Sequence, residues 1–243
     1  MSPPAPEWAV LPHGPIESLA ENLWYVSGEL PKMDLKRTMT VARLADGRLL
    51  LHSAIALDED GMQALESLGK PSFLVVPSGY HRMDAPRYKA RYPDITVLCP
   101  RGNRKRVEKV VPVDHCYEDC PLPDPSDDSV RLEYFDEGRR PEGIVLVRSE
   151  DGVTAIFNDV LFNVPHNKGL FWFVYGRLMG ASGGPKATPI ARLFLLRGAT
   201  GRGYRTWLTA AAERGDIVRL VPGHGDLVDE NVTGVLRDLA AGL

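Results

Sequence analysis

The chain has 243 residues and a formal net charge of −3, from 29 Lys and Arg against 32 Asp and Glu. Hydrophobic residues make up 44% and charged residues 25%, which is ordinary for a globular protein and excludes a collagen, a coiled coil or a disordered chain. The slight acidic excess offers no basic surface for phosphates, so we expect no nucleic-acid partner. The three cysteines are an odd number and argue against a disulfide framework.

The N-terminal segment predicts an irregular arm and no targeting signal. Residues 1–16 are rich in proline, and a single domain is expected over residues 17–243. The segment has no basic region and no continuous apolar stretch, so no secretory signal is expected. The most apolar later run, Gly169–Ala181, is too short to span a bilayer and contains Arg177. We therefore expect a cytoplasmic protein without a membrane span, whose oligomeric state the sequence does not indicate.

In the first half of the chain, strand and helix signals alternate. Asp46-Gly47 lies between two apolar runs and predicts a β-hairpin. The predicted strands are Leu23–Ser27, Thr38–Leu44, Arg48–His52, Phe73–Val76 and Ile95–Cys99. The predicted helices are Asp60–Leu68, a helix that opens at Asp84, and Asn103–Val110.

The second half begins with a polar, proline-containing loop over Asp114–Asp128. Another Asp-Gly pair at Asp151-Gly152 predicts a second hairpin. The predicted strands are Val130–Phe135, Ile144–Val147, Val153–Phe157 and Ile217–Val221, and the predicted helices cover about 163–181, 188–197, 203–214 and the end from about 230. Each half runs strands first and helices later, which suits two packed sheets with helices outside them.

His224 is the first candidate for chemistry. It stands between two glycines in Val221–Gly225, directly after a predicted strand. Glycines allow a close approach of the backbone, and a histidine at the end of a rigid strand is well placed to bind a metal. A histidine in such a turn is also commonly a surface or hydrogen-bonded residue.

Asp159 is the second candidate. It follows the predicted strand Val153–Phe157 and has apolar neighbours on both sides. A carboxylate in such surroundings needs a counter-charge, hydrogen bonds or a cation. Asn158 and Asp159 also suit the N-cap of a helix, and the two roles are compatible.

The third candidate segment, Ser78–Asp84, leaves the predicted buried strand Phe73–Val76. His81 and Asp84 are three residues apart near a helix N-terminus, a spacing that allows both to face one ion. In the alternative, Asp84 only caps the helix, and His81 stacks on Tyr80 or pairs with a carboxylate.

Together, these segments resemble the metallo-β-lactamase-fold superfamily over about residues 22–226. The resemblance implies an α/β fold, an αββα sandwich with its metals on loops at one sheet edge. The family's hallmarks are a His-x-His-x-Asp-His loop after a buried strand, a Pro-Gly-His stretch, a Gly-Asp-x-Leu-Phe stretch and a late Gly-His-Gly. Val221–Gly225 matches the last, and Phe157–Phe162 matches the Asp stretch with Asn158 in place of glycine. Early in the chain, His52 replaces the family's usual aspartate.

The chain departs from the family pattern where most of the ligands are expected. Aligning Ser78 with the family's leading threonine puts His81 on one histidine position and Asp84 on the last, and leaves two other ligand positions without a ligand. Aligning Pro77 there leaves no ligand at all. Arg139 replaces the histidine of the Pro-Gly-His stretch. We therefore expect a degenerate site that binds at most one metal.

The resemblance implies one set of candidate metal ligands, which is His81, Asp84, Asp159 and His224. Two histidines and a carboxylate suit one Zn²⁺ or Fe²⁺, with a coordination position open for water. Asp159 and Asp84 are the candidate catalytic residues. Arg139 and Tyr80 are the candidate substrate-binding residues, with Arg139 replacing the charge of a lost second metal or binding an anionic group, unless it is a solvated loop arginine.

Two functions follow from these residues. The first is a metal-dependent hydrolase that cleaves an ester, thioester or similar bond of a small-molecule substrate. The second is a metal-free, catalytically inactive member of the fold that binds a small molecule or a protein partner. The aromatic run Gly169–Tyr175 fits core packing, a wall of an apolar pocket or a docking surface. A metal assay separates the two functions.

Overall fold

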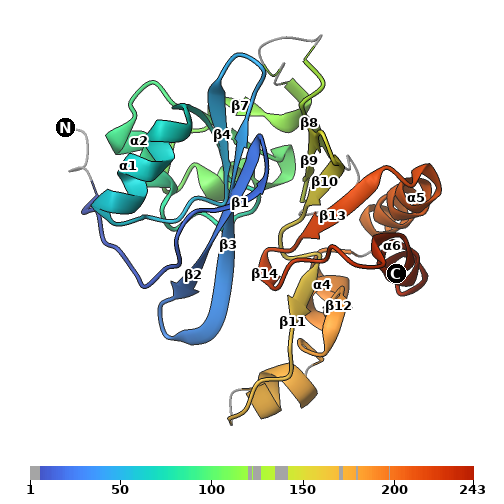
Figure 1. The fold of residues 1–243 in the computed structure, drawn as a ribbon. Coiled ribbons are helices and arrows are strands. Elements are labelled where there is room, and N and C mark those ends of the chain that lie inside the picture. The colour runs from blue at the N-terminus through green and yellow to red at the C-terminus, as the bar shows by residue number, and fades with distance from the viewer. Residues whose placement is uncertain are drawn as a thin grey trace.

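Two β-sheets form the centre of the fold, and helices cover the outer face of each sheet (Figure 1). The structure is a computed structural model that describes residues 6–119, 122, 127–134, 142–169, 172–178, 180–196 and 198–243. The layers are therefore helix, sheet, sheet and helix, which confirms the predicted αββα sandwich.

The first sheet contains seven strands among the described residues, in the order β1 to β7. They are β1 (Glu17–Ala20), β2 (Leu23–Leu30), β3 (Met33–Arg43), β4 (Arg48–His52), β5 (Lys70–Val75), β6 (Thr96–Cys99) and β7 (His115–Cys116). The strands β1 to β4 are antiparallel neighbours, and β4 to β7 are parallel. The helices on this side are α1 (Glu59–Leu68), α2 (Ala85–Arg91) and α3 (Arg104–Val107), with short 3₁₀ turns at Arg101–Asn103 and Tyr117–Asp119.

The second sheet has the order β13-β10-β9-β8. Its strands are β8 (Val130–Glu133), β9 (Ile144–Ser149), β10 (Gly152–Ile156) and β13 (Ile217–Val221), and its outer helices are α5 (Ala199–Arg214) and α6 (Val232–Ala241). Gly152 pairs with Ser149 across the turn between β9 and β10, so the predicted Asp-Gly hairpin is confirmed. The hairpin predicted around Asp46-Gly47 is confirmed as β3 and β4.

A small third sheet holds the chain near the predicted aromatic run. Its order is β12-β11-β14, with β11 (Phe162–Val164), β12 (Gly184–Lys186) and β14 (His224–Gly225). The helix predicted over about 163–181 is therefore wrong at its start, because β11 pairs with β14 and β12. Among the described residues of this range, only Trp172–Leu178 is helical, as a π-helix. Short apolar runs do not distinguish a strand from a helix, and here the pairing with distant segments makes this segment a strand. The next predicted helices are confirmed as α4 (Pro189–Phe194) and α5.

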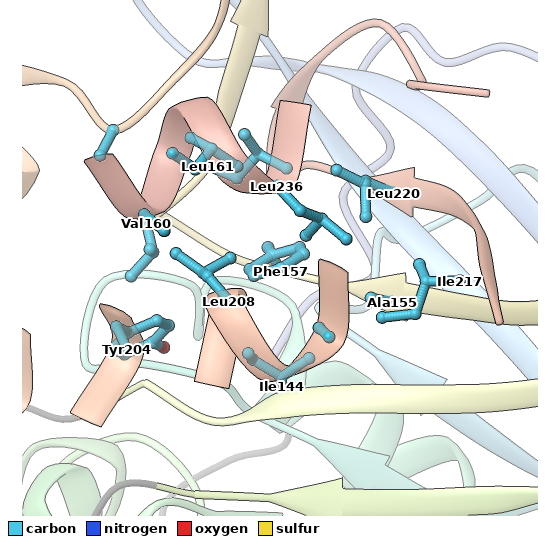
Figure 2. Packing of buried hydrophobic residues seen from close by; sticks show 14 of the residues in the cluster. Ile144, Ala155, Phe157, Val160, Leu161, Tyr204, Leu208, Ile217, Leu220 and Leu236 are labelled. Atoms are coloured by element: carbon cyan, nitrogen blue, oxygen red, sulfur yellow. The ribbon is translucent and has the colours of Figure 1, made fainter. Parts of the chain in front are cut away.

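Consecutive residues of one strand face two different hydrophobic cores. Leu50 of β4 lies in the core between the sheets, whereas Leu49 and Leu51 lie in the core under α1 and α2. In the second sheet, Phe157 packs in one cluster with Leu208 of α5 and Leu236 of α6 (Figure 2). This alternation is the two-residue period of a β-strand, and it explains why a sequence of mostly apolar strands builds four layers.

Four strands end at the same edge of the sandwich: β4 and β5 of the first sheet and β10 and β13 of the second. Each pair is parallel, so the carboxyl ends of its two strands lie side by side. In open α/β folds the loops after such strand ends are the usual place for a ligand. Among the described helices, none has the length and apolar character needed to cross a membrane.

Candidate metal centre

His81, Asp159 and His224 lie together at this edge: His81 and Asp159 are on the loops after β5 and β10, and His224 begins β14 just after β13. One ligand atom from each of the three residues lies within 4.8 Å of the other two. The Nε2 atoms of His81 and His224 lie 2.9 Å and 3.2 Å from the same carboxylate oxygen, Oδ1 of Asp159. The structure thus gathers three of the four candidate ligands around one point.

The turn that carries His224 requires glycine on both sides. A Cβ atom at Gly223 would lie within 3.0 Å of three backbone atoms of Asn158, and one at Gly225 would lie 2.1 Å from the carbonyl oxygen of Asn163. Gly225 also has a φ of +96°, which favours glycine. The two glycines therefore let the loop after β13 press against the loop that holds Asp159.

A buried hydrogen-bond network joins the His81 loop to the Asp159 loop. The Nδ2 atom of Asn158 donates to Oγ of Ser78 at 3.3 Å and to Oε1 of Glu142 at 3.0 Å. The same Ser78 oxygen accepts the backbone N–H of His81 at 3.3 Å. Burial raises the pKa of Glu142 well above its usual range, and the neighbouring charge of Asp159 raises it further. Glu142 therefore serves here as a buried neutral partner beneath the site.

The Nδ1 atoms of both histidines are occupied by other parts of the chain. His224 donates from Nδ1 to the backbone carbonyl of Lys36 at 2.7 Å, since a carbonyl oxygen only accepts. The Nδ1 atom of His81 lies 3.0 Å from Oγ of Ser53. These contacts leave Nε2 of each ring for the shared point, which is how outer hydrogen bonds commonly orient histidine ligands.

The carboxyl group of Asp159 is charged at neutral pH. Burial raises its pKa, but the nearby His81 and His224 imidazoles have the larger combined effect and hold the pKa well below its usual range. Its side chain is 18% exposed, so the group faces the outside through an opening rather than being sealed in the core. An ionised carboxylate beside two imidazoles is the donor set that a divalent metal takes in proteins.

The structure places Asp84, the fourth candidate ligand, in a different environment. Its side chain is 1% exposed, and its oxygens accept from Nη2 of Arg37 at 2.6 Å, Nη1 of Arg87 at 2.6 Å and the backbone N–H of Ala56 at 3.1 Å. Asp84 also precedes α2 as the predicted N-cap residue, but its side chain makes no capping hydrogen bond. Both oxygens are thus engaged by arginines, and the residue does not join the group around Asp159.

The remaining candidates are an exposed tyrosine and an arginine. Tyr80 lines the pocket described below, and the Arg106 guanidinium stacks on its ring at 5.5 Å. Arg139 lies outside the described residues. His52, where the family has an aspartate, is buried at the end of β4, and its Nε2 atom has no hydrogen-bond partner.

A pocket of about 480 Å³ opens directly beside the three ligand candidates. Its wall includes the apolar residues Leu30, Met33, Leu35, Phe162, Phe194 and Leu195. Volume and apolar lining are typical of a small-molecule site. The sequence indicated one part of this wall, since Tyr175 of the aromatic run belongs to it.

Sequence reasoning missed Arg37, which also lines this pocket and is buried. The available signal was an arginine at an inward position of a strand, two residues after the buried Leu35. It also missed Ser53 and Lys36, the partners of the histidine Nδ1 atoms, because contacts across strands leave no local pattern.

No family model matches the chain, and no curated protein matches its sequence. Solved structures do match its fold. DIM-1 metallo-β-lactamase is 13% identical with a TM-score of 0.62, covering 95% of this chain and 98% of that one. FIM-1 from Pseudomonas aeruginosa in a mono-zinc form is 14% identical with a TM-score of 0.57, covering 96% of each chain. A metallo-β-lactamase from Erythrobacter litoralis is 16% identical with a TM-score of 0.60, covering 94% and 96%. The chain therefore has the fold of the metallo-β-lactamase superfamily.

Proposed function

We propose that this protein is a metal-dependent hydrolase that holds one divalent metal, Zn²⁺ or Fe²⁺, with His81, Asp159 and His224. The observation that carries the proposal is the shared focus of two imidazole Nε2 atoms and one ionised carboxylate beside a pocket. FIM-1, which shares the fold, is described in a mono-zinc form, so a single zinc ion is compatible with this fold in that protein.

The spacing of the three groups fits a metal after a small opening. Bonds of about 2.0–2.1 Å to tetrahedral zinc place neighbouring ligand atoms about 3.3 Å apart. The two Nε2–Oδ1 distances here are 2.9 Å and 3.2 Å. These two distances lie within a few tenths of an ångström of the tetrahedral spacing, and the anchored Nδ1 atoms keep the Nε2 atom of each ring directed at the shared point.

Each group at the site has a separate proposed role in hydrolysis. A divalent metal at this point supplies Lewis acidity, which activates water and polarises a carbonyl near neutral pH. Asp159 balances the positive charge of the site, and the apolar wall excludes bulk water from one side. An ester or thioester is the substrate class we propose. Tyr80 at the pocket wall and Arg139 are proposed to contact the substrate, with Arg139 binding an anionic group.

The proposed ligand set omits Asp84, because its two oxygens already accept from Arg37, Arg87 and a backbone N–H. Release of Asp84 to a metal would leave the nearly buried guanidinium of Arg37 without its counter-charge, which is strongly unfavourable. A stoichiometry of one metal per chain follows.

Elemental analysis of protein purified without chelators tests the proposal. We expect about one metal per chain, or uptake of one equivalent on titration with zinc. His224→Ala should abolish uptake, because it removes one of two imidazoles, whereas His115→Ala, at an exposed histidine, should not change it. A stoichiometry of two would contradict the ligand set and direct attention to Asp84 or His52.

The second candidate function is a metal-free binding protein of this fold. The observation that favours it is that both Nε2 atoms lie at hydrogen-bond distance from the Asp159 carboxylate, so imidazole rings that carry a proton on Nε2 would bind this carboxylate without an ion. No metal uptake from zinc, iron or manganese, together with binding of a small molecule in the pocket, would support this function over the hydrolase.

A further inference from the structure

One wall of the pocket is a stripe of three side chains on β3. Met33, Leu35 and Arg37 alternate along the strand and all line the pocket. Met33 is 43% exposed, while Leu35 is 6% and Arg37 5% exposed, so the stripe runs from the mouth of the pocket to its inner end. The four residue steps from Met33 to Arg37 span about 13 Å along the strand, which sets the depth of this wall. The inner end adjoins the metal centre, because the carbonyl of Lys36 binds His224.

Another part of the wall comes from the third sheet, the π-helix and α4. Phe162 of β11 contacts the His224 ring, with centroids 4.8 Å apart, and lies at the inner end. Tyr175 and Leu195 continue this wall, and Phe194, which is 58% exposed, stands at the mouth. The wall of the pocket is therefore mostly apolar, and its charged side chains are those of Asp159 and Arg37, with hydroxyl groups from Ser53, Tyr80, Tyr175 and Thr188.

Arg37 offers an N–H donor, while its positive charge is already paired with Asp84. Its Nη2 atom pairs with Asp84 at 2.6 Å, and its Nε atom is buried and has no hydrogen-bond partner among the described residues. A buried unpaired N–H is costly, so this site favours a ligand with a single acceptor oxygen. Since Asp84 already provides the counter-charge of the guanidinium, Arg37 does not require an anionic ligand, and we expect a neutral carbonyl oxygen at this position.

We propose that the pocket takes an ester whose uncharged hydrocarbon acyl chain lies along the wall from Leu35 to Met33 and Phe194, with an ester oxygen near Arg37. Hydrolysis of this ester rests on the proposed function, but recognition of its hydrocarbon chain does not require the metal. Hydrolysis breaks the bond between the acyl carbon and the alkoxy oxygen; one water supplies the hydroxyl of the acid and the proton of the alcohol.

Binding to the metal-free protein tests recognition by itself. With EDTA present, calorimetry with n-alkanols from butanol to decanol should show affinity rising about two- to fourfold per methylene, because each buried methylene is removed from water. The carboxylates of equal length, from butanoate to decanoate, should bind more weakly. An affinity that does not change with chain length, or tighter binding of the carboxylates, would overturn the proposal.

Two neighbouring residues of α4 provide a matched pair of variants. Phe194 lines the pocket and Leu193, 49% exposed, does not. Both are exposed, so a lysine at either position should leave the fold intact. Phe194→Lys should weaken decanol binding at least about fivefold, and Leu193→Lys should leave it within about twofold. Equal effects of the two variants on decanol binding would show that the hydrocarbon chain does not lie beside Phe194.

Hydrolysis of p-nitrophenyl esters from acetate to decanoate then joins the two proposals. With metal bound, kcat/KM should rise with chain length in the same ratio as alkanol affinity, and Phe194→Lys should flatten the dependence. Chain-dependent binding without metal uptake would refute the hydrolase and keep the apolar ligand site. Metal uptake and hydrolysis without any dependence on chain length would refute the ligand site and keep the hydrolase.

Discussion

Arg37 and Asp84 form a buried ion pair, with Nη2 and Oδ2 2.6 Å apart and side chains 6% and 1% exposed. Asp84 belongs to the loop after β5 that also carries His81, and Arg37 belongs to the strand whose Lys36 carbonyl orients His224. The pair therefore links the supports of both histidines. It also explains why an aspartate in the motif loop is absent from the metal centre.

Removing Asp84 should be strongly destabilising. Asp84→Ala leaves the guanidinium of Arg37 buried and uncompensated, and breaking a buried pair in this way costs about 3–5 kcal/mol of the free energy of unfolding. Glu108→Ala is the matched control, because Glu108 pairs with Arg104 at the surface, with both side chains 40% exposed. That change should cost less than about 1 kcal/mol. Urea denaturation of both variants measures the difference, and equal losses would contradict it.

The buried His52 should make stability depend on pH. Burial lowers the pKa of His52 to about 3, and the neighbouring His81 contributes to this. The unfolded chain takes up this proton near pH 6.5 and the folded chain does not, so the stabilisation is complete above about pH 6.5 and is lost as the pH falls toward 3. From pH 7.5 to pH 5, the wild type should lose about 2 kcal/mol more than His52→Gln. Denaturation curves at both pH values test this, and parallel losses in the two proteins would contradict it.

Gly223 should not tolerate a side chain. Gly223→Ala places a Cβ within 3.0 Å of the Asn158 backbone, so one of the two ligand loops must move. We expect a loss of about 1–3 kcal/mol in the free energy of unfolding, as for other overpacked sites. Gly14→Ala is the control, because the nearest atom to its Cβ would be a carbonyl oxygen at 3.7 Å. Thermal unfolding of both variants measures the loss of stability. A Gly223→Ala protein as stable as the wild type would contradict this loop geometry.

The Ser53 hydroxyl should tune metal affinity without being a ligand. Ser53→Ala removes the partner of His81 Nδ1 and leaves the three proposed ligands in place. Loss of such an outer hydrogen bond typically lowers metal affinity about 10–100-fold. Competition with a chromogenic chelator measures this affinity. Ser67→Ala, which removes a hydroxyl bonded only within α1, is the control and should bind metal as the wild type does. An unchanged affinity in Ser53→Ala would show that His81 is oriented by other contacts.

Local sequence determined most of the two large sheets. The Asp-Gly pairs at Asp46 and Asp151 mark hairpins because the turn geometry depends on those residues alone. The outer helix α6 and the strand β13 follow from apolar periodicity in the same way. The Gly-His-Gly at Gly223–Gly225 pointed to a close approach of backbone that the structure shows against Asn158.

Only the tertiary structure decided which polar residues meet. His81 and Asp84 are three residues apart, yet one faces Asp159 and the other faces Arg37 from a distant strand. Likewise, Phe162–Val164 is a strand because β12 and β14 pair with it, although a helix was predicted to begin at about residue 163. Such outcomes depend on charges and hydrogen-bond groups far away in the sequence. Spacing along the chain predicts candidates, whereas burial and pairing across strands select among them.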